Sequence, residues 1–593
     1  GLQAEISTIK QSLRLISSRF HLVDMPLEMD ANVCEWPTEE AKRVKLFQPK
    51  ELDQVTCFFN FEKKDRLLKL VQDGGEEEII LDVIDPKDIV GVNVEIEWID
   101  QESDTTYTAQ DTTYPLPQIY QQGEVPEKYH KVPAQNESGW KDAVDRRARA
   151  ILSVFVYPKR RMRTKKSILR FCGSERSNSR TPKKAIVVPD DMVYRSGDKS
   201  DSMEMNKFVH RYSHHRRFIV APVEDFTDLS IMVNAIQNLS RPNSSLKTKS
   251  SIAEERILVI VNPTSGRKMG INIYDETLRP MLEQAGIAYD CLITTHPQHA
   301  EERMKKQNTT SDFRDLTEYT GIVLVGGDGT IHQVLQGIHR RDDRDKILER
   351  IKFGAIAAGT SNGFTASLAH ASKENHSPLE SAFMIVKGMS SPVDISQYET
   401  NSNSYISFLT FSWAMIADID VESECIRWAG FLRMDIWGVV RLLFLRKYRA
   451  KFSYLQANTG TTTKSIPPLN EPIPDSNEWV TCEDDFILFW ASQMTHAGEQ
   501  MFNAPSCKID DGIFHIMIVR GDVSRIQLAL ILLSMESGGH KYMTGVEFIE
   551  CSAYRLEPIT QGSFNDLDGE VIEAGAVQAA ISELPLLAYC NPQ

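Results

Sequence analysis

The sequence predicts a multidomain protein in which a β-rich N-terminal domain precedes an α/β domain with a mostly parallel sheet and an antiparallel, β-sandwich-like C-terminal domain. Short strand-like segments, punctuated by Gly74-Gly75, fill much of residues 51–240. Apolar strands alternate with amphipathic helices over 256–390, and short strands return over 391–593. At 593 residues the chain is also too long for a single hydrophobic core. These observations predict three or four packed units.

Composition and charge exclude several classes of protein. Hydrophobic residues make up 41% and charged residues 25%, which is typical of globular chains. The net charge of −15 argues against nucleic acid as a partner. Nine cysteines without a C-x-x-C pair favour a reducing compartment over a disulfide framework. The longest apolar run, 526–535, has about half of the ~20 residues that a membrane helix needs. We therefore expect a cytoplasmic protein that is recruited reversibly to membranes. The sequence leaves open whether the protein forms a homodimer.

The N-terminal half predicts a small antiparallel sheet. Residues 1–50 form a helical and acidic lead to which no function is assigned. Strand-like segments follow at 57–61, 66–71, 78–83, 89–98, 151–157, 167–172 and 216–221, interrupted by polar insertions. A helix begun by Asp225 closes the unit. This succession resembles a pleckstrin-homology domain over 51–240, and 241–255 reads as a linker.

A basic loop lies between two of these strands, in the segment PKRRMRTKK (158–166). One interpretation is a solvated hairpin loop. The other is contact with anionic membrane lipids, because each cation near an anionic leaflet contributes about 1 kcal/mol. The second interpretation is favoured by the resemblance, since pleckstrin-homology domains bind phosphoinositides there. Its cations are Lys159, Arg160, Arg161, Arg163, Lys165 and Lys166.

The sharpest motif is GGDGT (326–330), which directly follows the apolar segment GIVLV (321–325) and directly precedes an amphipathic helix. Glycines allow backbone N–H groups to approach phosphate oxygens, and a helix N-terminus favours negative charge. The alternative is a tight turn capped by an acid. Asp328 favours the functional interpretation, because a carboxylate beside phosphates is repelled unless it holds Mg²⁺ or accepts a proton.

Two further strand ends carry turns of the same kind. FGAIA (353–357) leads into AGTSNG (358–363), and ILVIV (257–261) leads into NPTSGRK (262–268). Ligands of open α/β folds bind at the carboxyl ends of the strands. Three such turns on one edge of one sheet predict a phosphate-binding site.

At these motifs the chain resembles the diacylglycerol-kinase-like lipid kinases, and within them the sphingosine branch, over about 256–590. The resemblance is carried by the three turns above and by FSWAMIADIDVESECIRWAGFLR (411–433), EDDFILFWASQMTHAGEQMFNAPSCKIDDG (483–512) and DLDGE (566–570). It implies ATP and Mg²⁺ as cofactors. It also implies transfer of phosphate to the primary hydroxyl of sphingosine or a related long-chain base, with the nucleotide bound over 256–390 and the lipid over 391–593.

The resemblance assigns roles to individual positions. Asp328 corresponds to the general base that deprotonates the lipid hydroxyl, and Asp420 to the partner of the substrate amine. A carboxylate in a lipid pocket can pair an ammonium group and reject neutral lipids. Positions lining the lipid tunnel are Ile416, Ile419, Ile531, Leu532 and His540. Nucleotide contacts are Asn262, Pro263, Thr264, Thr294, Thr295, His296, Pro297, Gln298, Gln333, Thr360, Ser361, Asn362, Arg427, Arg433, Asp568, Gly569 and Glu570. No metal ligands are assigned.

Four positions depart from the family pattern. Gln333 replaces a glutamate, Ala357 a proline, Ser361 a glycine and Met269 a lysine. The sequence leaves alternatives open: a ceramide or diacylglycerol kinase, an NAD-kinase-type phosphotransferase, and an inactive membrane adaptor. Asp420 argues against the first, the sheet-rich second half against the second, and the retained acids at 328, 420 and 570 against the third.

Overall fold

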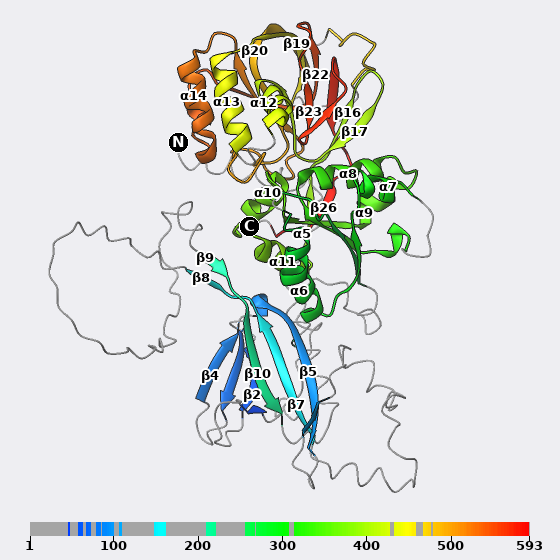
Figure 1. The fold of residues 1–593 in the computed structure, drawn as a ribbon, viewed down its shortest axis with the longest axis vertical. Helices are drawn as coiled ribbons and strands as arrows, with labels where there is room; N and C mark the ends of the chain where they lie inside the picture. Colours follow the sequence, from blue (N-terminus) through cyan, green and yellow to red (C-terminus); the bar gives the residue numbers. More distant parts are fainter. Residues whose placement is uncertain are drawn as a thin grey trace, which may run out of the picture.

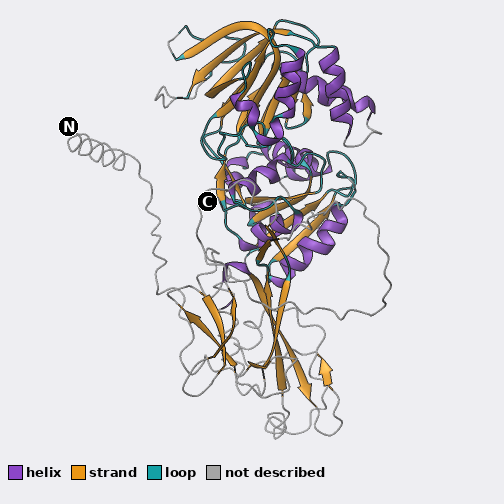
Figure 2. Cartoon of the chain, turned by 90° about the vertical axis from the view of Figure 1, so that its left-hand side faces the viewer, coloured by secondary structure: helices purple, strands orange, loops and turns teal. Residues whose placement is uncertain are grey.

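The computed structural model describes two parts of the chain. In the N-terminal part it describes the strands given below and a few residues beside them, and from there on residues 255–266, 268–306, 314–426, 432–457, 466–475 and 478–591. Three units follow one another along the long axis of the molecule (Figures 1 and 2): an N-terminal sheet, a central α/β unit, and a C-terminal unit of sheet and helices. This is the order of architectures that the sequence predicts.

The N-terminal unit contains an eight-stranded sheet in the order β4-β3-β2-β1-β10-β7-β5-β6. All of its pairings are antiparallel, as predicted. The predicted segment 167–172 and most of the predicted closing helix lie outside the described residues. The strands are β1 (Leu46–Phe47), β2 (Cys57–Glu62), β3 (Leu67–Gln72), β4 (Ile79–Ile84), β5 (Ile89–Ile99), β6 (Thr106–Thr108), β7 (Ala148–Val156) and β10 (His214–Val220).

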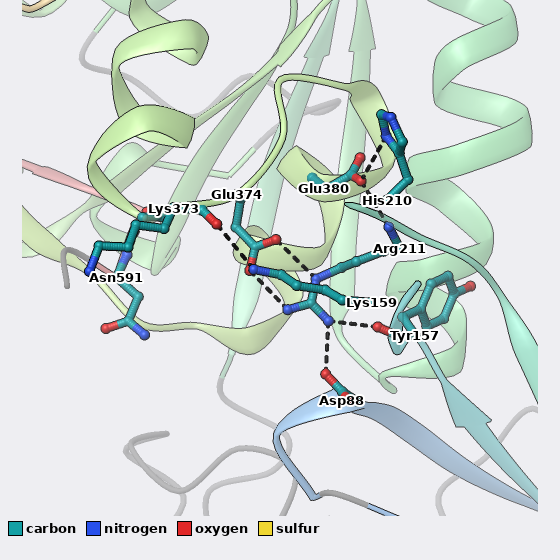
Figure 3. Close-up of polar contacts among 10 residues, drawn as sticks. Asp88, Tyr157, Lys159, His210, Arg211, Lys373, Glu374, Glu380 and Asn591 are labelled. Atoms are coloured by element: carbon teal, nitrogen blue, oxygen red, sulfur yellow. Dashed lines mark hydrogen bonds and ion pairs between the residues drawn. The ribbon is translucent and has the colours of Figure 1, made fainter. Parts of the chain in front are cut away.

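A buried arginine joins this unit to the central one. Arg211 ends β9 (Val209–Arg211), and its Nη1 lies 2.9 Å from Asp88 Oδ1, while Nη2 lies 2.8 Å from Glu374 Oε1 (Figure 3). The guanidinium carbon also lies 3.6 Å from the centre of the Phe383 ring. A guanidinium that is shielded from water needs this many partners, because an unpaired buried charge is costly. The N-terminal unit is therefore fixed to the central unit by specific contacts.

The start of the basic loop is part of the same junction. Lys159–Arg161 is a strand, β8, that pairs with β9, whereas the sequence predicted a loop there. The Lys159 ammonium lies 3.0 Å from Glu374 Oε1 and donates to the carbonyl oxygen of Lys373 at 3.1 Å. Because the charge of Lys159 is paired within the protein, it is not free for a membrane. Arg163, Lys165 and Lys166 lie outside the described residues.

The central unit has a six-stranded sheet in the order β12-β11-β13-β14-β26-β15. Every pairing is parallel except that of the edge strand β15 with β26. The unexpected member is β26, which returns from the end of the chain to continue this sheet beside β14. The strands are β11 (Arg256–Val261), β12 (Ala288–Ile293), β13 (Gly321–Gly326), β14 (Lys352–Ala357), β15 (Ser391–Val393) and β26 (Leu586–Ala588).

Helices cover both faces of the central sheet, which explains why its strands are continuously apolar. Residues 257–261 and 321–326 are all buried. Val334 and Leu335 pack on one face with Leu324, while Leu278 and Ile385 pack on the other with Val323. The helices are α5 (Gly270–Ile273), which a π-helical turn (Tyr274–Leu278) joins to α6 (Arg279–Gln284), then α7 (His299–Lys305), α8 (Asp328–His339), α9 (Arg344–Arg350), α10 (Gly363–Ala371) and α11 (Pro378–Lys387).

The C-terminal unit is built on a ten-stranded antiparallel sheet in which β21 pairs with both β20 and β22. Because β19 also pairs with these two strands, the sheet folds back on itself around an aromatic core that includes Trp413, Phe489 and Tyr554. The strands are β16 (Ser396–Glu399), β17 (Ser404–Ser407), β18 (Thr410–Ala414), β19 (Tyr448–Gln456), β20 (Trp479–Ser492), β21 (Phe514–Arg520), β22 (Glu547–Pro558), β23 (Asn565–Leu567), β24 (Glu570–Ile572) and β25 (Val577–Ile581).

Three helices lie side by side against this sheet (Figure 1): α12 (Met415–Ser423), α13 (Arg433–Leu443) and α14 (Arg525–Leu533). Their inner residues share an apolar cluster with the sheet, to which Ile419, Met517 and Leu528 belong. No described helix is long and apolar enough to cross a bilayer.

Candidate active site

The three predicted glycine turns converge at the carboxyl edge of the central sheet. A Cβ on Gly327 would lie 3.0 Å from the Cα of Gly359, so the turns after β13 and β14 pack backbone to backbone. Gly266 has φ +50°, and a Cβ there would lie 2.5 Å from the carbonyl oxygen of Ala358. Only glycine allows approaches this close. The predicted convergence of the turns is thus present in the fold.

Asp328 lies where two of these turns meet. It is the first residue of α8, and its Oδ2 accepts a hydrogen bond from the backbone N–H of Gly363 at 2.8 Å. Its Oδ1 accepts from the N–H of Phe364 at 3.2 Å. Burial raises the pKa of Asp328 to about 6, although these N–H donors favour the charged form. A carboxylate with this pKa is ionised at neutral pH and still basic enough to accept a proton.

Side chains of the first turn tie it to the signature turn. Asn262 donates from Nδ2 to the Thr330 hydroxyl at 3.1 Å, while its Oδ1 accepts from the N–H of Thr264 at 3.0 Å. On the turn between β12 and α7, Gln298 has φ +67° and precedes the helix. The predicted nucleotide positions Pro263, Thr295, His296 and Pro297 lie on these two turns.

The second glycine turn is held by its own asparagine. Asn362 has φ +55°, its Oδ1 accepts from the N–H of Gly359 at 2.8 Å, and its Nδ2 donates to the Gly359 carbonyl at 3.0 Å. Thr360 and Ser361 remain exposed on this turn. Its two hydroxyls are therefore available to a ligand above the sheet edge.

The DGE segment contributes two acids with different environments. Both oxygens of Asp568 are used inside the protein: Oδ1 accepts from the Ser407 hydroxyl at 2.7 Å and from the N–H of Leu409 at 3.0 Å, and Oδ2 lies 3.1 Å from His332 Nδ1. By contrast, Glu570 reaches the signature turn, because a Cβ on Gly329 would lie 2.7 Å from its Oε1. Asp568 thus holds strands together, and Glu570 is the member of the pair that faces the turn.

Asp420 lies on α12, across the domain junction from the turns. Burial raises its pKa and the charge of Glu570 adds to the rise, while Arg433 opposes it. The Arg433 Nη2 atom lies 3.6 Å from Asp420 Oδ1, and the same guanidinium is paired with Glu424. Arg433, predicted as a phosphate contact, thus contacts acids in this structure, and Arg427 lies outside the described residues.

The predicted lipid-lining residues largely come together. Ile416, Ile419, Ile531 and Leu532 belong to one apolar cluster between α12, α14 and the sheet. His540 is fully buried, and its Nε2 lies 2.9 Å from the carbonyl oxygen of Asn503. Burial lowers the pKa of His540, so the ring is neutral. Gln333 lies half-buried on α8.

Sequence reasoning missed two acids near Asp420. Asp418 accepts hydrogen bonds from the Tyr448 hydroxyl and lies 3.8 Å from Arg441, so it fixes α12 to its neighbours. Asp566, in the DLDGE segment, is buried beside Asp420. Its place in that motif was the one available signal, and strand pairing is needed to bring it to α12.

In this arrangement an α/β domain, whose glycine turns hold a buried carboxylate, meets an antiparallel domain, whose Glu570 reaches the signature turn. Residues 256–398 match the family model of the diacylglycerol kinase catalytic domain. This match, together with the relatives described next, supports a lipid kinase.

Similar proteins extend beyond that domain. The chain is 29% identical over 351 residues to human sphingosine kinase 1, covering 55% of this chain and 88% of that protein. It is 26% identical to sphingosine kinase 1 of Arabidopsis thaliana, covering 56% and 72%. It is 25% identical to sphingoid long chain base kinase 4 of Schizosaccharomyces pombe, covering 53% and 70%. A solved structure of a diacylglycerol kinase from Bacillus anthracis aligns with 57% of this chain and 97% of its own, at 16% identity and a TM-score of 0.39.

Proposed function

We propose that this chain transfers the γ-phosphoryl group of ATP to the primary hydroxyl of sphingosine or a related long-chain base. The observation that carries the proposal is the position of Asp328, a buried carboxylate where two glycine turns meet. The likeness to sphingosine kinases of human and Arabidopsis thaliana, and to a sphingoid long chain base kinase of Schizosaccharomyces pombe, supports the same substrate class. The products are the sphingoid base 1-phosphate and ADP.

In this mechanism Asp328 is the general base. The lipid oxygen attacks the γ-phosphorus while its proton passes to the Asp328 carboxylate, and the bond from the γ-phosphorus to the bridging oxygen of ADP breaks. The backbone donors at Gly363 and Phe364 hold the carboxylate in one orientation. Positioning of this kind, with electrostatic stabilisation, supplies most of the catalysis in phosphoryl transfer.

The residues present fit ATP and Mg²⁺. The glycine turns provide backbone N–H groups, and the exposed hydroxyls of Thr360 and Ser361 add donors for phosphate oxygens. Carboxylate oxygens are the ligands that Mg²⁺ prefers, and we propose Glu570, which reaches the signature turn, as a residue that would hold it. Asp568 is a poor candidate because its oxygens already accept internal hydrogen bonds. The ion would neutralise charge on the phosphates.

The substrate amine is assigned to Asp420. A carboxylate whose pKa is raised by burial and by a neighbouring acid gains stability when a cation arrives. The ammonium group of a long-chain base is such a cation, and ceramide or diacylglycerol lacks it. The apolar cluster that contains Ile416, Ile419 and Ile531 packs between α12, α14 and the sheet and suits the hydrocarbon chain.

We also propose that the lipid enters from a membrane surface at α13 and α14. The outer faces of these helices carry large apolar side chains that are about half exposed or more, and the inner faces contribute to the lipid-side cluster. An exposed apolar patch of this kind marks an interaction site. A bilayer is the occupant that would also supply the substrate. The exposed residues are Leu432, Ile436, Val439, Leu443, Phe444, Ile526, Leu530 and Leu533.

We further propose that the N-terminal sheet is a pleckstrin-homology-type module that assists recruitment of the enzyme to the membrane. Because Lys159 is paired with Glu374, any electrostatic contribution to membrane binding must come from the other cations of the basic loop.

The enzymatic proposal is tested by incubating the purified chain with ATP and sphingosine in detergent micelles. Formation of sphingosine 1-phosphate supports it, and the absence of labelled product from sphingosine contradicts it.

A further inference from the structure

Asp566 is a buried acid with an unused hydrogen-bonding atom. It lies on β23 opposite Ser412 of β18, and its Oδ2 accepts from the Ser412 hydroxyl at 2.7 Å. The residue is 7% exposed. Its other oxygen, Oδ1, is buried and has no hydrogen-bond partner among the described residues. Buried polar atoms of folded proteins are nearly always paired, so this oxygen points to a missing partner.

The surroundings of Asp566 are acidic. Burial raises its pKa well above the ordinary range, and the charges of Asp420, Asp568 and Glu570 raise it further. Among the groups that most affect this pKa, only the Ser412 hydroxyl favours the charged form. Arg433, whose charge lowers the pKa of Asp420, is already shared between Asp420 and Glu424. Two carboxylates in such a place require a shared proton or a cation from outside.

The position of Asp566 indicates which cation fits between it and Asp420. Strand β18 carries Ser412 and ends at Ala414, where α12 begins and leads to Asp420. Asp566 thus lies beside the strand that leads into α12, and the charge of Asp420, on that helix, acts on it. An ammonium group has three N–H donors, more than one carboxylate satisfies in a fixed geometry.

We propose that Asp566 is a second carboxylate that receives the ammonium group of the substrate together with Asp420, so that a pair of acids, not one, selects free long-chain bases. This inference rests on the proposed function. The ammonium donates to the free Oδ1 of Asp566 and to Asp420, and the proton that the pair holds in the empty site leaves to solvent. A neutral, N-acylated lipid would leave both carboxylates without a counter-ion, which makes the pair selective against it.

The test compares two substrates, sphingosine and a long-chain 1,3-diol that lacks the amine, and measures kcat/KM for each. The ratio of the two values isolates the contribution of the ammonium group. Asp566→Asn is expected to lower the ratio by about tenfold or more, because a charged hydrogen bond is lost. The KM for ATP and the Mg²⁺ concentration for half-maximal rate are expected to stay unchanged. Asp566→Ser, which is smaller and also neutral, serves if the Asn variant does not fold.

The matched control is Asp522→Asn, an equal charge change at an exposed position between β21 and α14, which should leave the ratio unchanged. In a double-mutant cycle with Asp420→Asn, the two losses are expected to be non-additive. An unchanged ratio in both Asp566 variants overturns the inference, and so does a shift in Mg²⁺ dependence without a change in the ratio. If the wild type phosphorylates neither substrate, the proposed function itself has failed, which is a distinguishable result.

Discussion

The carboxylate of Asp328 accepts a hydrogen bond from the backbone N–H of Gly363 at 2.8 Å, which ties the first residue of α8 to the first residue of α10. The two helices follow different strands of the sheet, so this one contact joins two glycine turns. It also places an acid among helix-terminal N–H donors, which favour its charged form. The contact therefore fixes the orientation of the proposed base before any ligand binds.

Replacing Asp328 by Asn should reduce kcat by at least about 100-fold, because an amide cannot accept the proton of the lipid hydroxyl. The Asn side chain keeps an oxygen for one of the two backbone donors, so the fold should persist. Turnover on sphingosine with labelled ATP measures the loss, and circular dichroism checks the fold. Turnover within a fewfold of the wild type would remove Asp328 from the mechanism.

The pH dependence of stability should report the same residue. Because the pKa of Asp328 is raised from 3.8 to about 6, the folded state holds this proton to a higher pH than the unfolded chain does. The stability that the proton provides is full below about pH 4 and is lost as the pH rises through about 6, by an amount on the order of 3 kcal/mol.

Asp328→Asn removes this titration, so the unfolding free energy of the variant relative to the wild type should rise between pH 4 and pH 7. Urea denaturation at several pH values measures the difference. A difference that stays constant over this range would show that the pKa of Asp328 is ordinary. Activity of the wild type should also fall below about pH 6, where the base becomes protonated.

Gly359→Ala should damage the nucleotide site, because the added Cβ would overlap the Cα of Gly327. We expect a KM for ATP raised at least about tenfold, with destabilisation of about 1–3 kcal/mol from overpacking. Gly438→Ala is the matched control: its Cβ would meet no atom closer than 3.9 Å, and α13 should gain about 0.5–1 kcal/mol. Equal ATP kinetics in the two variants would contradict the proposed role of the turn.

The exposed apolar faces of α13 and α14 should determine membrane binding. Val439→Glu with Leu533→Glu should lower binding to anionic liposomes and activity on liposome-borne sphingosine, because charged side chains oppose insertion among lipid tails. Activity on sphingosine in detergent micelles should change little. Sedimentation with liposomes measures binding, and unchanged sedimentation would place the membrane-facing surface elsewhere.

The parts of the site that the sequence predicts are those that depend on local order along the chain. A strand, a glycine turn and a helix follow one another at 321–339, so the position of Asp328 at a strand end could be read directly. The convergence of the three turns followed from the rule that parallel strands end on one edge. The architecture of both kinase domains followed in the same way.

What the sequence did not predict depends on pairing between distant segments. Nothing local shows that β26 returns to the central sheet, or that Asp568 turns its oxygens toward Ser407 and Leu409. In the sequence, Arg211 resembles the other surface cations. Only its contact with Glu374 shows that it is buried between the N-terminal and central units. For the same reason the sequence did not predict a role for Asp566, because its neighbour Asp420 is distant in the sequence.

The most direct test of the account is a comparison of acceptors. The purified chain is given radiolabelled ATP with sphingosine, dihydrosphingosine, phytosphingosine, ceramide and diacylglycerol in identical micelles, and the initial rate of labelling is measured for each. The account predicts that the three free long-chain bases are labelled and that ceramide and diacylglycerol are labelled at least about tenfold more slowly, because they lack the ammonium group. Faster labelling of ceramide or diacylglycerol than of any free base would contradict it.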